Sequence, residues 1–384
     1  MAKTISTTDL AQQLGNPALV VVDVRPMAAY NGWQLQGEAR GGHIPGAIAC
    51  PLSWTEGVAG DDLKPLLRSK GITQDKTVVV YGYTPNQSAA MANRLRDLGY
   101  ENVLAYEAGL AAWAADLSLP MARLANYKKL VHPEWLHTLM RKGHAETYPG
   151  RGFAVFHVNF GVPEEYEKGH IPGAMHLDTN TLESASTWNH LSGEDLEAAL
   201  LAHAITHDKT IVLYGRDSLP PADEAHPGRN AGQIAATRAA AILMYAGVED
   251  VRLLDGGFDA WVSAGYEVET EGHKPTPVQA FGAQIPAYPE YIIDMDEAKA
   301  LITDPDGVLV SIRSWPEFIG ESSGYNYIGR RGRIAGAVWG NGGSDAYHMQ
   351  HYRNIDNSMR DYREIEGNWR AAGITPDRRV AFYC

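Results

Sequence analysis

Cys384 is the residue of this chain best placed to do chemistry. It follows the run RVAFY (379–383), a short apolar segment typical of a buried β-strand. At the tip of a strand that leads into a helix, a cysteine faces backbone N–H groups, which favour the thiolate. Because the thiolate is the reactive form, we predict Cys384 as a nucleophile. The second cysteine, Cys50, lies in an apolar stretch, and we expect it to be a small buried core residue.

The remaining residue types indicate no metal and no cofactor. No CxxC or HExxH motif occurs, and the 14 histidines show no spacing typical of zinc ligands. The two cysteines lie far apart in the chain, so there is no disulfide framework. We therefore predict no metal site and no cofactor.

An internal repeat positions Cys384. The hexamer GHIPGA occurs at 42–47 and 169–174, and a degenerate copy, GRIAGA, occupies 332–337. We call each copy of this hexamer a tag. An apolar strand pattern precedes each tag and a second one follows it. These patterns cover 19–25 and 77–82, then 154–159 and 210–215, then 308–313 and 379–384. Repetition at domain spacing indicates three related modules. Apolar strands that alternate with helical segments predict an α/β fold in which each module is a parallel sheet flanked by helices.

The repeat also sets the predicted domain boundaries. We predict module one at 1–124, module two at 125–271, a proline-containing linker at 272–289, and the front part of module three at 290–384. Modules one and two continue into helices predicted from Ser88 to Leu98 and from Ala231 to Ala246, which end at Gly99 and Gly247. Each then has a third strand and a tryptophan, Trp113 or Trp261, which we expect in the core.

Ligands of an open parallel sheet bind at the carboxyl ends of its strands. The tip of the second strand carries Gly82 in module one, Gly215 in module two and Cys384 in module three, so module three alone offers a nucleophile there. Module two adds a long polar loop at 218–230. Such a loop is either functional or a solvated insertion, and the second interpretation is favoured.

The order of strand, GHIPGA tag, helix, strand and cysteine resembles the rhodanese family of sulfurtransferases, over essentially all 384 residues. The segments at 211–217, 251–257 and 311–320 carry the most specific likeness. The resemblance implies that Cys384 attacks the sulfane sulfur of a donor such as thiosulfate. It also implies that the cysteine persulfide then passes sulfur to cyanide, a small thiol or a protein thiol.

The same resemblance assigns Arg313 to the family's D-x-R strand end, although Ser311 replaces the aspartate. It implies that Arg313 either braces the site structurally or contacts the sulfur donor, and the bracing role is favoured. Some relatives carry an arginine where this chain has Glu317, which argues against tight thiosulfate binding. The family builds its anion cradle from the loop directly after the cysteine. We expect a chain that ends at Cys384 to be inactive.

Two other functions remain open because a fold does not settle function. One is a cysteine phosphatase on the same scaffold, and the other is a non-catalytic sulfur-relay or docking scaffold. The net charge of −13 argues against nucleic acid as a partner, and no apolar stretch is long enough to cross a membrane. With no signal peptide in the sequence, we expect a cytoplasmic protein, or a periplasmic one if a signal was removed.

Overall fold

A computed structural model describes residues 3–56, 58, 60–184, 187–218, 230–324, 329–343 and 349–384. The chain divides into two compact units, Met1–Lys128 and Lys129–Cys384. Three sheets, each with parallel strand pairs and flanking helices, confirm the predicted fold class of tandem modules. None of the described helices is long and apolar enough to cross a lipid bilayer.

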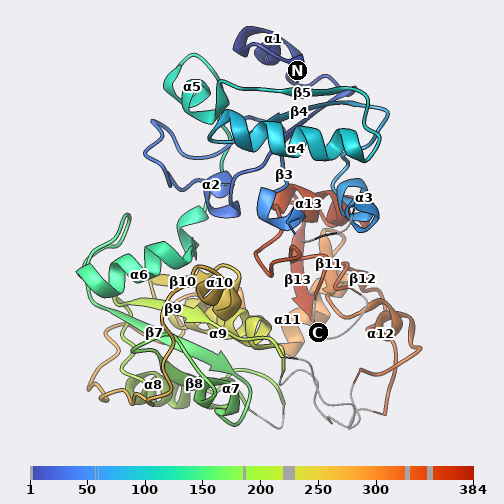
Figure 1. Cartoon of the computed structure of the whole chain (residues 1–384). Coiled ribbons are helices and arrows are strands. Elements are labelled where there is room, and N and C mark those ends of the chain that lie inside the picture. Colours follow the sequence, from blue (N-terminus) through green and yellow to red (C-terminus); the bar gives the residue numbers. More distant parts are fainter. Residues whose placement is uncertain are drawn as a thin grey trace. The chain divides into compact units, whose positions relative to one another are not determined.

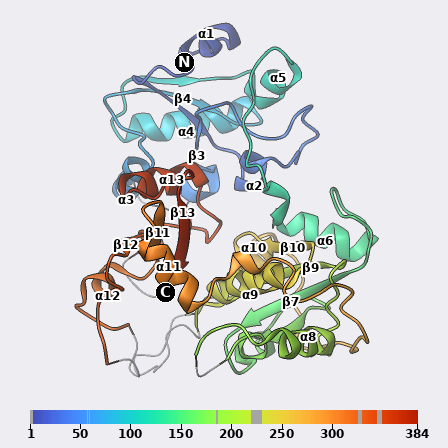
Figure 2. The same cartoon turned by 180° about the vertical axis from the view of Figure 1, so that it is seen from behind.

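The first unit is one module around a five-stranded sheet. Its elements are β1 (Lys3–Thr4), α1 (Thr7–Gln13), β2 (Leu19–Asp23), α2 (Met27–Asn31), β3 (Ile48–Ala49), η1 (Leu52–Thr55), α3 (Gly60–Ser69), β4 (Thr77–Tyr81), α4 (Pro85–Asp97), β5 (Val103–Ala105) and α5 (Gly109–Ala115). The strand order is β1-β5-β4-β2-β3, and every pair is parallel. Figures 1 and 2 show α4 along one face, while α1 and α5 lie on the other side. Both faces bury apolar side chains, which explains the unbroken apolar run of β4.

The helix predicted from Ser88 begins earlier, at Pro85. The Thr84 side chain accepts a hydrogen bond from the backbone N–H of Gln87, and the Gln87 side chain accepts one from the backbone N–H of Thr84. This capping box and a proline in the first turn are the usual start of a helix. The predicted start was therefore wrong, because the cap is a polar signal that apolar periodicity does not register.

The second unit begins with a module of the same strand order, β6-β10-β9-β7-β8. Its elements are η2 (Tyr127–Lys129, which spans the division), β6 (Leu130–Val131), α6 (Pro133–Lys142), β7 (Phe153–Asn159), α7 (Glu164–Glu167), β8 (Met175–Asp178), η3 (Thr179–Thr181), α8 (Gly193–Ala202), β9 (Thr210–Tyr214), α9 (Gly232–Ala246), β10 (Asp250–Leu254) and α10 (Gly257–Ser263). The buried face of α9 packs against β7, β9 and β10 in one large apolar cluster.

The segment predicted as a linker, 272–289, is fastened to module two. It forms no helix or strand before η5 (Pro289–Tyr291). Phe281 is 1% exposed and belongs to the apolar cluster of module two. The backbone N–H groups of Val278 and Tyr288 donate to the carbonyls of Leu201 and Tyr245. These contacts make the segment part of the module surface rather than a free spacer.

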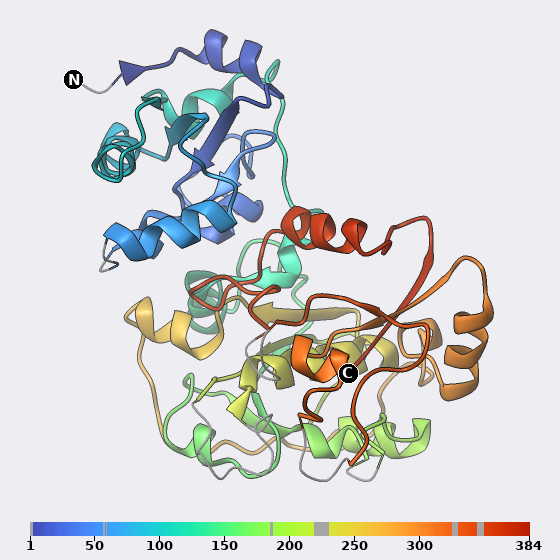
Figure 3. The ribbon, with the colours of Figure 1, turned by 90° about the vertical axis from the view of Figure 1, so that its right-hand side faces the viewer.

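Module three contains a three-stranded sheet in the order β12-β11-β13. Its elements are α11 (Met295–Thr303), β11 (Gly307–Ser311), α12 (Trp315–Ile319), β12 (Val338–Trp339), α13 (Tyr362–Ala371) and β13 (Arg379–Tyr383). The C-terminus lies beside α11 in Figures 1, 2 and 3. Leu301 of α11 accordingly packs near Tyr383. Unlike β4 and β9, β13 is an edge strand of its sheet, and Phe382 is 45% exposed.

Candidate active site

One hydrogen bond, from the tag to the tyrosine before the strand tip, recurs in all three modules. The backbone N–H at the third tag position donates to the tyrosine hydroxyl. The three bonds run from Ile44 to Tyr81 (3.1 Å), from Ile171 to Tyr214 (2.9 Å) and from Ile334 to Tyr383 (3.0 Å). Burial raises the pKa of Tyr81 and Tyr214 well above the usual tyrosine value, so both hydroxyls stay protonated. The repeated bond gives a structural basis for treating Gly82, Gly215 and Cys384 as equivalent positions.

The tip of module two has no room for a nucleophilic side chain, and the tip of module one is crowded by the Gln87 side chain. A Cβ atom on Gly82 would lie 2.8 Å from Oε1 of Gln87. A Cβ atom on Gly215 would lie 1.9 Å from the carbonyl oxygen of Gly232, at the start of α9. Backbone cannot rotate away as a side chain can, so module two excludes any residue larger than glycine at this tip.

Cys384 occupies the corresponding position in module three and is exposed. It follows β13 directly, and β13 is paired with β11 through the bond between the Ile312 N–H and the Tyr383 carbonyl (2.9 Å). The structure therefore brings Cys384 and Arg313 to the same edge, at the ends of neighbouring strands. This is the edge at which parallel sheets bind ligands.

The guanidinium of Arg313 is held by groups of module three. It lies 2.8 Å from the Glu317 carboxylate and donates to the carbonyls of Gly332 (3.1 Å) and Ser323. Arg25 does the same in module one, where it donates to the Gly42 carbonyl (2.6 Å). Both arginines thus join the strand end to the first glycine of the tag. These contacts support the bracing role of Arg313, whose part in catalysis stays a prediction.

The residue opposite the tip tyrosine differs in every module. In module one, Asp23 accepts from the Tyr81 hydroxyl at 2.7 Å and pairs with Arg25 at 2.7 Å. Module three has Ser311, whose buried hydroxyl has no hydrogen-bond partner among the described residues. Module two has His157, with neither ring nitrogen bonded within the described part of the chain. The aspartate network exists only in module one of these three.

Three predicted core residues are confirmed, and most of one predicted loop is not described. Cys50 and Trp113 are both 0% exposed, and Trp261 is 1% exposed. Most of the module-two loop, 219–229, lies outside the described residues. Its ends are joined by a 2.9 Å backbone bond from Ser218 to Asn230, so the loop begins and ends at one point.

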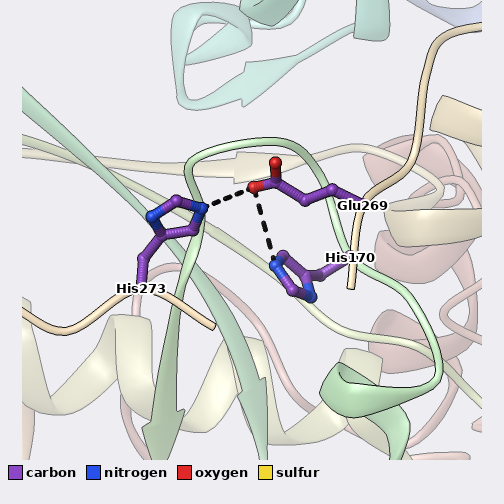
Figure 4. Close-up of side chains that lie close together, drawn as sticks. All are labelled: His170, Glu269 and His273. Atoms are coloured by element: carbon purple, nitrogen blue, oxygen red, sulfur yellow. Dashed lines mark hydrogen bonds and ion pairs between the residues drawn. The ribbon is translucent and has the colours of Figure 1, made fainter. Parts of the chain in front are cut away.

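Sequence reasoning missed one group of potential metal ligands. His170, Glu269 and His273 come together in module two, although they span a hundred residues of sequence (Figure 4). Only the four-residue spacing from Glu269 to His273 is visible in the sequence. The prediction of no metal ligands depended on the spacing of residues within short motifs. Such spacing cannot reveal ligands that lie in separate segments of the chain.

The fold and the repeated tip geometry define a rhodanese-type protein. The Rhodanese-like domain profile matches residues 6–116 and 133–264, which is more than half of the chain. The chain belongs to the rhodanese family.

One relative extends this likeness through module three. Thiosulfate sulfurtransferase YnjE of Escherichia coli K12 is 38% identical over 387 residues, covering 100% of this chain and 83% of that protein. The sulfur carrier protein TtuD of Thermus thermophilus is 28% identical over 57% of this chain and 72% of its own length.

Solved structures of EanB are similar over the whole chain. The wild-type enzyme has a TM-score of 0.96 at 43% identity, covering 100% of this chain and 88% of that one. The anaerobic ergothioneine biosynthesis enzyme from Chlorobium limicola, in complex with trimethyl histidine, matches with the same identity and TM-score and with 90% of its chain covered.

Proposed function

We propose that this protein is an enzyme that moves sulfane sulfur through a persulfide on Cys384. The observation that carries the proposal is a cysteine at the strand tip where the other two modules have glycine. The thiolate attacks the outer sulfur of thiosulfate, the S–S bond breaks, and sulfite leaves with the bonding electrons. An acceptor then attacks the persulfide sulfur, and the electron pair returns to Cys384.

The test replaces Cys384 by serine in the complete protein. A serine hydroxyl ionises far above neutral pH and is a much poorer nucleophile than a thiolate, so transfer from thiosulfate to cyanide should stop. The parent protein, treated with thiosulfate, should gain the mass of one sulfur atom on the peptide that contains Cys384. Cys384→Ser should gain none.

The matched control is Cys50→Ala, which also removes one thiol but in a buried position. It should keep the transfer rate as long as the protein stays folded. A sulfur adduct on the Cys50 peptide, or full transfer by Cys384→Ser, would contradict the assignment. Phosphatase activity without sulfur transfer would favour the cysteine phosphatase. Neither activity in the complete protein would favour a docking scaffold.

A second acceptor is supported by the 43% identity with EanB over the whole chain. The structure of that enzyme with trimethyl histidine suggests a histidine betaine as the molecule that takes the sulfur. The protein should then convert trimethyl histidine and a sulfane donor into the thione, detected by mass spectrometry. Turnover of trimethyl histidine above that of cyanide would place the protein with EanB, and the reverse with YnjE.

A further inference from the structure

Three side chains of module two converge on one point at the surface of the tag turn (Figure 4). Nε2 of His273 lies 2.7 Å from Oε1 of Glu269, and Nε2 of His170 lies 3.7 Å from the same oxygen. The His170 side chain is fully buried, whereas those of Glu269 and His273 are 29% and 37% exposed. The group is therefore anchored inside the protein and open to solvent on one side.

The backbone holds this arrangement in place. His170 and Glu269 form an antiparallel bridge, with N–H to carbonyl distances of 2.9 and 3.0 Å. The backbone N–H of His273 donates to the Tyr166 hydroxyl at 2.9 Å, and the ring of Tyr166 stacks on His170. The N–H of Gly173 donates to Oε1 of Glu269. These bonds hold the tag turn and the segment that contains Glu269 and His273 in place without any ligand.

The hydrogen bonds of His170 point to a cation at this position. Its Nδ1 lies 2.8 Å from the Tyr166 carbonyl and its Nε2 lies 3.0 Å from the Glu271 carbonyl, and a neutral ring carries a proton on one nitrogen only. The shorter contact places that proton on Nδ1. In the neutral ring, Nε2 then presents a lone pair. That lone pair faces the carbonyl oxygen of Glu271 at 3.0 Å and the Glu269 carboxylate at 3.7 Å. Three electron-rich groups facing one another are stable only around a proton or a metal ion.

We propose that His170, Glu269 and His273 form a site for a divalent transition metal of the zinc type. Imidazole nitrogens and a carboxylate suit zinc and exclude a dedicated calcium or magnesium site. The ligand atoms all lie within 4.8 Å of one another. The partly exposed His273 ring would turn away from Oε1 of Glu269, because two ligands at about 2.0–2.2 Å from one metal ion lie farther apart than the present 2.7 Å. The bond from Nδ1 of His170 to the Tyr166 carbonyl orients that ring, as ligating histidines require.

The site is specific to module two. Module one has His43 bridged to Ala122 in the equivalent place, and Asn126 stands where module two has His273. Module three has Arg333 in place of the tag histidine. A metal here would join the tag turn to the segment that continues toward module three. The site is separate from Cys384 and does not depend on the proposed sulfur transfer.

The experiment is a titration of the metal-free full chain with Zn²⁺ by calorimetry, and with Co²⁺ by visible absorption. It uses the Cys384→Ser background, so that the exposed thiol does not supply a competing ligand. We expect one equivalent of metal to bind tightly. The bound Co²⁺ should show the visible absorption of a cobalt ion with a low coordination number. Loss of an outer-shell partner alone lowers metal affinity about 10–100-fold, so Glu269→Gln and His273→Ala should each lower it by at least ~100-fold.

Glu269→Gln is nearly isosteric and can still accept from Gly173, which keeps the test independent of folding. His144→Ala removes an exposed histidine elsewhere in module two and should leave affinity unchanged. Absence of a bound equivalent would overturn the proposal. Binding of equal affinity in the parent, Glu269→Gln and His273→Ala would overturn it as well.

Discussion

Replacement of His157 by phenylalanine should make the protein more resistant to acid. His157 lies in β7, is 0% exposed, and has no hydrogen-bond partner on either ring nitrogen among the described residues. Its ring is surrounded by aromatic rings, with the Tyr214 centroid at 4.9 Å and the Tyr166 centroid at 5.8 Å. Such an environment accepts a neutral ring and opposes a charged one.

The size of the effect follows from the pKa of His157. Burial, with smaller contributions from His176, His170 and Arg216, lowers this pKa from 6.5 to about 3. Below pH 6.5 the unfolded chain binds a proton that the folded chain does not, so stability falls as the pH falls, until about pH 3. Near pH 5 the loss, relative to neutral and higher pH, is about 2 kcal/mol. Phenylalanine cannot bind the proton, so His157→Phe should lose this part of the dependence.

The assay is urea unfolding of parent and variant, followed by tryptophan fluorescence between about pH 8 and about pH 5. A chelator is present throughout, so that the proposed metal site does not contribute. The compared quantity is the change in unfolding free energy with pH, which is insensitive to any constant packing cost of the larger ring. His144→Ala controls for the loss of one imidazole and should follow the parent. Identical pH dependence in the parent and His157→Phe would refute the reasoning.

Three further predictions concern the tips and the tag. Gly215→Cys should lower the melting temperature and create no second persulfide site, because its Cβ would collide with the Gly232 carbonyl at 1.9 Å; a sulfur adduct on this cysteine would contradict it. Gly173 has φ +75°, and no atom lies within 4 Å of the place where a Cβ would be, so the cost of Gly173→Val is backbone strain. The variant should lose about 1–2 kcal/mol of unfolding free energy in urea, and an unchanged midpoint would be inconsistent with that strain. Arg313→Lys should lower stability and kcat, since lysine cannot reproduce the contacts to Glu317 and Gly332. A raised KM for thiosulfate with unchanged kcat would instead indicate that Arg313 contacts the donor.

The repeat was predictable because its signals are local. The tag, the apolar strands and the tyrosine before each tip recur in the sequence, and the fold class and the equivalence of Gly82, Gly215 and Cys384 followed from them. The start of α4 was predicted less well, since the Thr84–Gln87 cap depends on two polar side chains rather than on periodicity. Cys50 was assigned to the core correctly because a cysteine within an apolar stretch is usually buried.

Other features depend on contacts between distant segments. The carbonyls that hold Arg313 come from loops ten and nineteen residues away in sequence. Phe281 gives the predicted linker a place in the core of module two, which proline content alone does not indicate. His170 and Glu269 meet because the segment after α10 returns and forms an isolated antiparallel bridge with the tag.

By itself, the sequence determined which apolar runs form buried strands, where strands end, and which tip carries a thiol, since short-range periodicity and backbone preferences decide these. Only the tertiary structure decided what fills the two glycine tips and which imidazoles and carboxylates meet. These are decided by the packing of segments far apart in the chain, and their proximity leaves no trace in residue spacing.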